Sequence, residues 1–262
     1  MRLAVRYRAL LPYLLLAPGL AWLAIFFIIP IFALGQRSLE EGTFAEGFRF
    51  TWHWQNYPEL VSQFREQFIR SFRFAGMATL LAFLIGYPLA YFIAFRGGRF
   101  KNLLLFLVIL PFFTTYLIRT LAWKIILADQ GFVISTLQDL QIMAILDALH
   151  ISTDGRVLDT ATAVVAGITY QWLPFMILPI YVSLEKIDKR LVEAAQDLYA
   201  SAPTAFRKVV LPLSLPGVFA GSLLTFIPAA GDFVNARLLG GTGDLMIGNV
   251  IQSKFLVLLD FP

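Results

Sequence analysis

The sequence predicts an all-α membrane protein, a polytopic bundle of transmembrane helices. Of its 262 residues, 58% are hydrophobic and only 15% are charged, and the mean hydropathy is +0.73. Five apolar runs reach about 20 residues, the length of a helix that crosses the hydrocarbon core of a bilayer. A water-soluble domain of this size would have too little polar surface to cover itself, so a soluble fold is excluded.

Polar segments separate the five expected spans. The spans cover residues 10–34, 72–95, 103–127, 161–184 and 213–233. A further apolar run starts at Phe255, and we expect it to begin a sixth span that is cut off at the C-terminus. The first run is longer than the apolar core of a cleaved signal peptide, so we expect it to remain as a helix. Residues 1–262 are thus expected to form a single transmembrane domain.

Basic residues are distributed unequally between alternate loops. Segments 1–9, 96–102 and 185–212 hold three, three and five Lys or Arg residues, whereas segments 35–70, 129–159 and 235–262, which are longer in total, hold four, one and two. Short loops rich in Lys and Arg stay on the cytoplasmic side of the membrane. We therefore expect the N-terminus and residues 185–212 to be cytoplasmic.

The expected outer loops carry acidic and aromatic residues. Segment 129–159 holds five aspartates against Arg156 alone, which could attract cations or could form a solvated loop without a ligand. Trp52, Trp54 and Tyr57 suit either an aromatic belt at the membrane surface or a docking surface. His53 and His150 lack further ligands at metal-binding spacing, and the chain has no cysteine, so we expect neither a metal site nor a disulfide.

The cytoplasmic segment 185–212 is predicted to form two short helices. Apolar residues recur at helical spacing through residues 185–200. Ser201 can cap a second helix, Pro203 is tolerated in its first turn, and Pro212 is expected to end it. Small residues in the first helix would let a partner protein approach its backbone closely. An amphipathic helix that lies on the membrane surface is the alternative interpretation.

The motif Glu193-Ala194-Ala195, followed by Leu211-Pro212 and Pro216-Gly217, resembles the EAA loop of ABC importer permeases. The resemblance covers most of the chain and points to permeases of the spermidine/putrescine type. It is carried by Leu110–Arg119, Leu173–Pro179, Ile227–Phe233, Leu239–Gly241 and Leu245–Asn249. It implies the type I ABC importer permease fold. It also implies a loop that docks on an ATPase through Glu193, Ala194, Ala195 and Asp197, with Arg207 and Lys208 beside them.

One residue departs from the family pattern, since Tyr199 stands where the loop usually has glycine. Glycine adopts a left-handed backbone at little steric cost, whereas tyrosine does not. We therefore expect either a turn at Ala200-Ser201 or a loop that is bent differently.

The resemblance implies a multi-subunit importer in the cell inner membrane. Its other members would be a second homologous permease subunit, a dimer of ATP-binding subunits and an external substrate-binding protein. The sequence has no G-x-x-x-x-G-K-[ST] phosphate loop, so ATP and Mg would be bound by the ATPase subunits. We expect this chain to be a transport subunit rather than an enzyme, with lipid and protein partners and no nucleic acid.

Polar residues at membrane depth are the candidates for the substrate pathway. Tyr170, Gln171 and Trp172 precede two prolines that would free backbone carbonyls toward a cavity. Aromatic rings beside an amide suit an alkylammonium substrate, although simple packing between helices is the alternative. Asp232, in a proline-interrupted span, is the expected acidic partner for an amine.

Arg119 and Lys124 of the third span would repel a polyamine inside the pathway. Either both extend to the outer surface or pair with acidic neighbours, or the substrate is an anion. We compare three functions: a polyamine importer permease, an ABC permease for ferric iron, thiosulfate or another small solute, and a self-sufficient secondary transporter or membrane enzyme. The motifs favour the first, and no catalytic constellation or internal repeat in the sequence supports the third.

Overall fold

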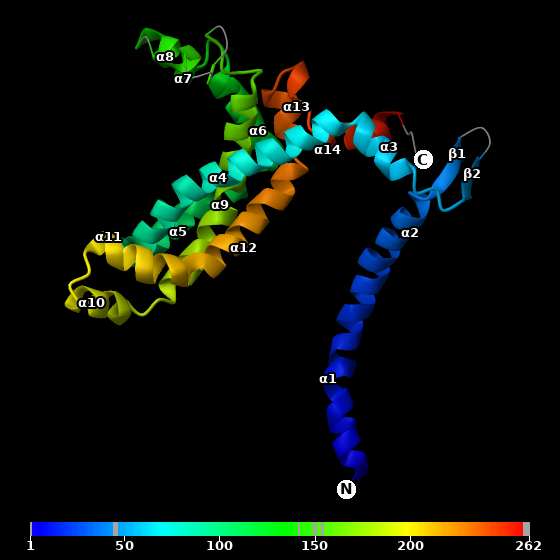
Figure 1. Ribbon diagram of the computed structural model, residues 1–262, viewed down its shortest axis with the longest axis horizontal. Helices are drawn as coiled ribbons and strands as arrows, with labels where there is room; N and C mark the ends of the chain where they lie inside the picture. Colours follow the sequence, from blue (N-terminus) through cyan, green and yellow to red (C-terminus); the bar gives the residue numbers. More distant parts are fainter. Residues whose placement is uncertain (1, 44–46, 141, 149–150, 153–154, 259–262) are drawn as a thin grey trace. The chain divides into compact units, whose positions relative to one another are not determined.

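The computed structural model describes the chain except for residues 1, 44–46, 141, 149–150, 153–154 and 259–262 (Figure 1). His150 and Asp154 of the expected outer loop therefore lie outside the described residues. The chain divides into two compact units, one ending at Arg65 and the other covering Glu66–Leu259.

The first unit holds one long helix and a small hairpin. Helix α1 (Arg2–Leu23), the π-helical turn η1 (Ala24–Ile28) and α2 (Ile29–Arg37) follow one another without a break. The part Pro12–Arg37 is apolar and long enough to cross a membrane, and its side chains are exposed almost throughout. This helix extends three residues beyond the expected span.

The all-α expectation misses one feature of this unit, an antiparallel hairpin. Strands β1 (Glu40–Thr43) and β2 (Gly47–Phe50) pair so that Glu40 faces Phe50. Helix α3 (Asn56–Gln63) follows, and its Asn56 side chain donates to the backbone oxygens of Ser38 and Glu40, at 3.1 and 3.2 Å. Next to these bonds the rings of Trp52 and Trp54 stack, with centroids 6.3 Å apart.

The second unit begins with helices on either side of a sharp bend. Helix α4 covers Arg65–Arg96, and η2 (Gly98–Phe100), α5 (Lys101–Ile109) and η3 (Leu110–Phe113) lead to α6 (Tyr116–Leu127). The predicted span 103–127 is not one straight helix, because the chain turns by 93° between Phe113 and Tyr116. Thr114 and Thr115 adopt extended backbones there, and Thr115 is the N-cap of α6.

The remaining helices all belong to the second unit. Their bounds are α7 Phe132–Asp139, α8 Met143–Ala148, α9 Ala161–Glu185, α10 Lys189–Asp197, α11 Ala202–Ala205, η4 Phe206–Val210, α12 Leu211–Ala230, α13 Val234–Leu239, η5 Thr242–Asp244, α14 Ile247–Gln252 and η6 Ser253–Leu258. Helix α9 continues through Pro174 and Pro179 without interruption. The expected sixth helical region starts at Ile247, ahead of Phe255. The structure thus has four membrane-length helices, or five if the bent pair is one span, within the described part of the chain.

The prediction that Pro212 ends a helix is wrong. Residues Ala202–Ala230 form one helical segment of 29 residues, and Pro212 lies inside it. Proline clashes with the carbonyl of the residue four positions earlier, which here is Lys208. The wider π-helical turn η4 directly precedes Pro212 and changes the backbone spacing at this point. The proline is therefore accommodated, and the fifth helix begins well before Leu213.

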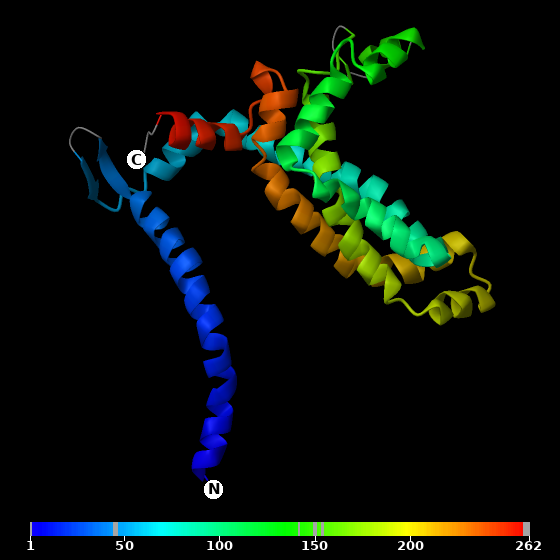
Figure 2. The ribbon, with the colours of Figure 1, turned by 180° about the vertical axis from the view of Figure 1, so that it is seen from behind.

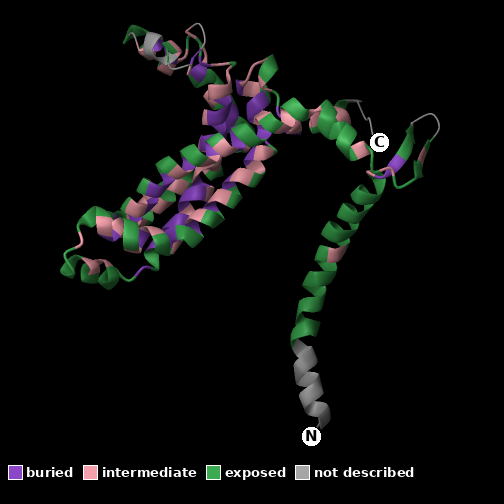
Figure 3. Cartoon of the chain, viewed as in Figure 1, coloured by how far each residue is buried: buried purple, intermediate pink, exposed green. Residues whose placement is uncertain are grey.

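Helices α9 and α12 lie side by side along their lengths (Figures 1 and 2). A Cβ atom on Gly217 would lie 2.5 Å from the Pro179 backbone oxygen, and one on Gly221 would lie 2.9 Å from that of Met176. These two glycines form a G-x-x-x-G motif, which lets helix backbones approach closely in a membrane. Figure 3 shows buried residues concentrated where these helices meet α4.

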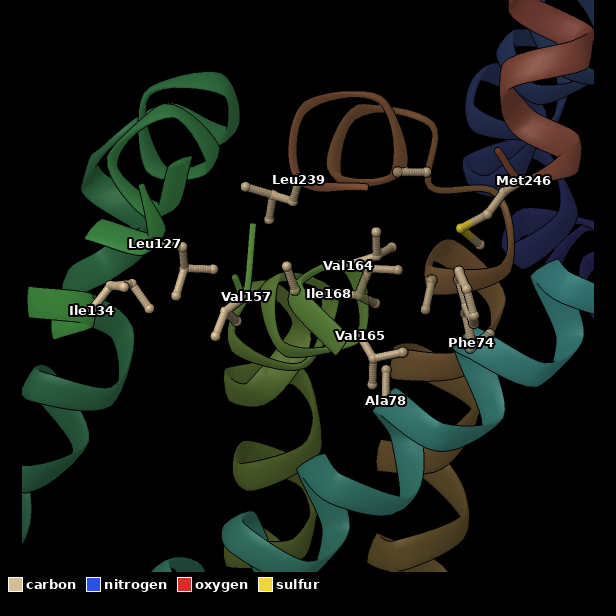
Figure 4. Close-up of a cluster of buried hydrophobic side chains, with 14 of the residues drawn as sticks. Phe74, Ala78, Leu127, Ile134, Val157, Val164, Val165, Ile168, Leu239 and Met246 are labelled. Carbon is tan, nitrogen blue, oxygen red and sulfur yellow. The ribbon is translucent and has the colours of Figure 1, made fainter. Parts of the chain in front are cut away.

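Two clusters of buried apolar side chains stabilise the unit. One surrounds Ile177, Ile180 and Leu184, toward the α10 end of the helix pair. The other lies toward α13, where Val164 of α9 and Phe74 of α4 share a core with Leu239 (Figure 4). The two clusters hold α9 at both of its ends. Helices α10 and α13 lie at opposite ends of the α9–α12 pair (Figures 1 and 2).

Candidate functional sites at the two ends of the helix pair

Helix α10 carries the residues of the EAA motif on a short, exposed helix. Asp188 caps it, since its side chain accepts a hydrogen bond from the Arg190 backbone N–H at 3.0 Å. Glu193, Ala194 and Asp197 are exposed, and Ala195 is half-buried. The helix lies against α11 and η4, where Arg207 and Lys208 are exposed too. The structure thus brings all six predicted coupling residues into one segment, which we call the coupling segment (residues 188–210).

The turn after α10 is made at Tyr199. Its φ angle is +60°, in the left-handed region. The Ala200 N–H bonds to the Ala195 oxygen at 3.0 Å, and the Tyr199 N–H bonds to the Gln196 oxygen at 2.9 Å. This pair of bonds defines a Schellman motif, whose left-handed position favours glycine. The expected shift of the turn to Ala200-Ser201 is therefore wrong. The left-handed turn stays in place, although tyrosine makes it about 1–2 kcal/mol less favourable.

Ser201 and Pro203 begin the next helix, as predicted. Ser201 is the N-cap residue of α11, and its backbone oxygen accepts from the Ala205 N–H at 2.9 Å. Its hydroxyl bonds to the Thr204 hydroxyl at 2.9 Å rather than to a backbone N–H. The cap therefore rests on backbone geometry and on a pair of side chains.

An ion pair joins α5 to the end of α9, close to the coupling segment. The Lys101 ammonium contacts the Glu185 carboxylate, and the same ammonium lies 5.2 Å from the centre of the Tyr181 ring. Both charged side chains are partly exposed, so solvent screens the pair. The ion pair mainly holds the end of α9 in position, directly before the coupling segment begins.

At the other end of the helix pair, Asp232 lies in a buried hydrogen-bonded cluster. The Tyr116 hydroxyl and the Asn235 side-chain nitrogen both donate to Asp232 Oδ2, the latter at 2.8 Å. The Asn235 backbone N–H donates to Oδ1 at 2.9 Å, and the Asn235 side chain also bonds to the Tyr116 hydroxyl at 2.7 Å. Asp232 is only 5% exposed. Three donors thus converge on a carboxylate that only accepts.

A cavity of about 250 Å³ opens beside this cluster. It is lined by Tyr116, Trp172, Pro228, Gly231, Asp232, Phe233 and Val234. The rings of Tyr116 and Trp172 are 6.3 Å apart, and the Trp172 Nε1 is buried without a hydrogen-bond partner among the described residues. We call this the Asp232 cavity. It combines a carboxylate with aromatic rings, the set that binds organic cations.

The predicted trio on α9 does not form one site. Trp172 lines the Asp232 cavity, whereas Tyr170 lines a separate apolar cavity of about 260 Å³ and packs on Trp123, at 5.6 Å between ring centres. Gln171 is 3% exposed, and its Nε2 has no hydrogen-bond partner in the described part of the chain. The structure therefore brings only Trp172 of the three to Asp232.

Arg119 differs from its sequence-based interpretation. It is 9% exposed, and it makes no ion pair with any described acidic residue, so it neither reaches the surface nor pairs with a neighbour. Its guanidinium lies 5.0 Å above the Phe112 ring, while Nε and Nη1 have no hydrogen-bond partner among the described residues. Lys124, in contrast, is exposed, which agrees with extension toward the surface.

The acidic outer segment is tied down in part. The Arg156 guanidinium binds the Asp129 carboxylate through two contacts, 2.6 and 3.1 Å long. This pairing raises the pKa of Arg156. Asp147 accepts from the Ser152 hydroxyl at 2.5 Å and from the Gly155 backbone N–H. Two of the five aspartates therefore already have partners, which weakens the interpretation of the segment as a free cation vestibule.

The sequence analysis missed Tyr116 and Asn235. Asp232 lies two residues before α13 and accepts from the Asn235 backbone N–H in its first turn, so the spacing Asp-x-x-Asn was a local signal for this part. Tyr116 comes from a helix more than a hundred residues away, and no local pattern links it to Asp232. The Leu245–Asn249 motif also meets this corner, since the Asn249 side chain donates to the Phe233 oxygen at 2.8 Å.

The helical architecture and these motifs match a known class of membrane protein. The chain belongs to the family of binding-protein-dependent transport system inner membrane components, whose sequence pattern matches residues 82–256. It is thus a permease-type component of a transport system and a multi-pass protein of the inner membrane.

Within that family the sequence is similar to polyamine permeases. It is 40% identical to the spermidine/putrescine transport system permease protein PotB of Haemophilus influenzae over 243 residues, which cover 92% of this chain and 82% of that protein. It is 38% identical to the protein of the same name from Escherichia coli K12, covering 92% and 85%. It is 34% identical to the inner membrane ABC transporter permease protein YdcU of that organism, covering 71% and 60%.

The fold is shared with a solved importer. A chain in the crystal structure of a bacterial ABC transporter involved in the import of the acidic polysaccharide alginate matches with a TM-score of 0.68 at 17% identity. The match covers 99% of this chain and 89% of that chain. The expected ABC importer permease fold is confirmed.

Proposed function

We propose that this chain forms half of a polyamine pathway in an ATP-driven importer, together with a second permease subunit. An external binding protein would deliver spermidine or putrescine, and two ATP-binding subunits would supply the work. The observation that carries the substrate class is the Asp232 cavity. A buried carboxylate beside Tyr116 and Trp172 offers an acceptor and two ring faces to a protonated amine, and each ring contact contributes about 0.5–2 kcal/mol.

Each residue at the cavity has a distinct role in this proposal. Asp232 accepts the ammonium, and Asn235 holds the carboxylate through its backbone and side-chain N–H groups. The Tyr116 hydroxyl satisfies Asp232 when no amine is present. An incoming ammonium supplies the same kind of donor, so it can replace the hydroxyl without leaving the carboxylate unpaired.

The coupling segment would receive the motion of the ATPase. Glu193, Ala194, Ala195 and Asp197 would contact the ATP-binding subunit, with Arg207 and Lys208 beside them. All but the half-buried Ala195 are exposed, as a partner surface requires. ATP and Mg would be held by the partner, and this chain would catalyse no covalent step. The Lys and Arg bias supports a cytoplasmic side for this segment and for the N-terminus.

Arg119 favours a second candidate substrate, thiosulfate or another small anion. Its guanidinium is buried with two nitrogens unpaired within the described chain, and such donors suit oxyanions. The polyamine proposal carries more weight, because Asp232 lines an open cavity and Arg119 does not line that cavity. A ferric iron substrate has no equivalent support from these contacts.

Uptake by the complete importer, with both permeases, the ATPase and the binding protein in vesicles, tests the proposal. When ATP is supplied on the side of the membrane that holds the ATPase, labelled putrescine and spermidine should accumulate on that side. Thiosulfate and ferric iron should not accumulate. Asp232→Asn should lower polyamine uptake roughly tenfold, because the anionic acceptor of the ammonium is lost.

Asp129→Asn is the matched control, since Asp129 is a surface carboxylate paired with Arg156. Its uptake should equal that of the unmodified importer. Unchanged polyamine uptake by Asp232→Asn, with the variant present at normal levels, would reject the role of the Asp232 cavity. Accumulation of thiosulfate instead would favour the Arg119 alternative.

A further inference from the structure

We propose that the Tyr199 ring is an anchor that inserts into an apolar pocket of the ATP-binding partner. The inference rests on the proposed function of the coupling segment and extends it to a residue outside the EAA motif. Glycine, which is usual at this position, has no side chain and could not make this contact.

The left-handed backbone conformation at position 199 is less favourable for tyrosine than it would be for glycine. The Schellman bonds at Ala200 and Tyr199 require the left-handed conformation, and glycine adopts it without a steric clash. A strained residue at an exposed turn points to a use for its side chain. The strain does not serve the turn itself, because the backbone bonds would be the same with glycine.

Tyr199 is 99% exposed, and its side chain makes no hydrogen bond or ring contact with any residue that the structure describes. Trp52 offers a comparison within the same chain, since it also has a left-handed backbone, with φ +54°. The Trp52 ring packs on Phe50, at 4.8 Å between ring centres. The ring contact with Phe50 thus offsets the strain at Trp52 within this chain. At Tyr199 the compensating contact must come from another protein.

The surroundings of Tyr199 indicate a protein partner. Leu198 next to it is 82% exposed, so two apolar side chains extend from the same turn. Exposed Glu193 and Asp197 stand on the helix that precedes it. Exposed Lys189 and Arg190 on the same helix balance these two charges, so α10 lacks the excess of basic residues with which amphipathic helices bind anionic lipids. A protein groove with an apolar pocket and charged residues of both signs at its rim fits the two apolar side chains and the mixed charge of α10.

Two substitutions separate the ring from the turn. Tyr199→Gly removes the ring and relieves the backbone, while Tyr199→Phe keeps both the ring and the strain. In the purified permease pair, Tyr199→Gly should unfold at a temperature equal to or above that of the unmodified protein. Its affinity for the ATP-binding subunit, measured on the pair in nanodiscs, should fall about tenfold, and Tyr199→Phe should keep most of the affinity.

A loss of affinity without a loss of thermal stability is what a purely structural role of Tyr199 cannot give. If Tyr199→Gly binds the ATPase as tightly as the unmodified pair while Ala194→Trp does not, the anchor is rejected and the coupling segment survives. If neither change weakens binding, the proposed coupling site fails as well. If Tyr199→Gly loses both thermal stability and affinity, the ring stabilises the loop and the anchor is again rejected.

Discussion

The α9–α12 pair and the coupling segment are built on opposite principles, although they adjoin in the chain. Between α9 and α12, glycines remove side chains so that backbones touch, and Gly217 leaves no room for even a methyl group beside Pro179. In the coupling segment the side chains extend into solvent, and the turn at Tyr199 carries the largest exposed ring of the loop. The first region packs within this chain, and the second is the surface that we propose meets a partner.

This difference separates two kinds of constraint on sequence. Substitutions in the packed pair should alter folding first and transport only as a result. Substitutions in the coupling segment should leave the fold intact and interrupt transport alone. Measuring stability and uptake on the same variants tests whether that division holds.

The largest effect on stability is expected for Gly217→Ala. The added Cβ would lie 2.5 Å from both the Pro179 backbone oxygen and the Ser183 Cβ, so the helices must separate. Overpacking of this kind costs about 3 kcal/mol at the upper end of the usual range, and unfolding in mild detergent should report it. Gly76→Ala is the control, because nothing lies within 4 Å of the new atom. Equal stability of the two variants would contradict the close packing of α9 on α12.

Ala194→Trp should abolish most uptake without unfolding the protein. Ala194 is exposed on α10, so the indole can extend into solvent and would obstruct the proposed ATPase surface. We expect uptake to fall roughly tenfold while the unfolding midpoint stays unchanged. Ala194→Ser keeps the residue small and should transport normally. Normal uptake by the tryptophan variant would mean that this face of α10 is not an interface.

Tyr87→Phe should produce the smallest of these effects. The Tyr87 hydroxyl bonds to the Ser214 hydroxyl at 2.8 Å and joins α4 to α12. Its loss should lower the free energy of unfolding by about 1 kcal/mol and leave uptake nearly unchanged. Tyr13→Phe, at an exposed position, should change neither quantity. A Tyr87→Phe effect as large as that of Gly217→Ala would show that hydrogen bonding, rather than close packing, dominates the bundle.

Local patterns predicted the parts of this structure that depend on local physics. Hydropathy located the membrane helices, and the Ser201-x-Pro203 signal located the start of α11. Pro212 misled, because it lies inside the continuous helical segment Ala202–Ala230, just after a π-helical turn. The bend at Thr114 was hidden because apolar residues continue on both sides of it. Hydropathy measures transfer into lipid and carries no information about direction.

One candidate site could be predicted from a local sequence pattern, and the other could not. All six coupling residues fall within 16 positions of the sequence, so a motif could find them. The Asp232 cavity draws Tyr116 and Trp172 from separate helices, and their meeting follows from packing alone. The G-x-x-x-G spacing of Gly217 and Gly221 was present in the sequence and would have predicted a close contact between helices.

The uninterrupted helical segment Ala202–Ala230 has a mechanical consequence. Its 29 residues correspond to a rod roughly 43 Å long. Arg207 and Lys208 lie near one end, and Asp232 follows the other end by two residues. In the proposed importer, a torque applied by the ATPase would turn the carboxylate directly, without a relay of side chains between them. The ATPase contact and the substrate contact would then lie on the same helical segment. The π-helical turn near Pro212 would determine how stiff that segment is.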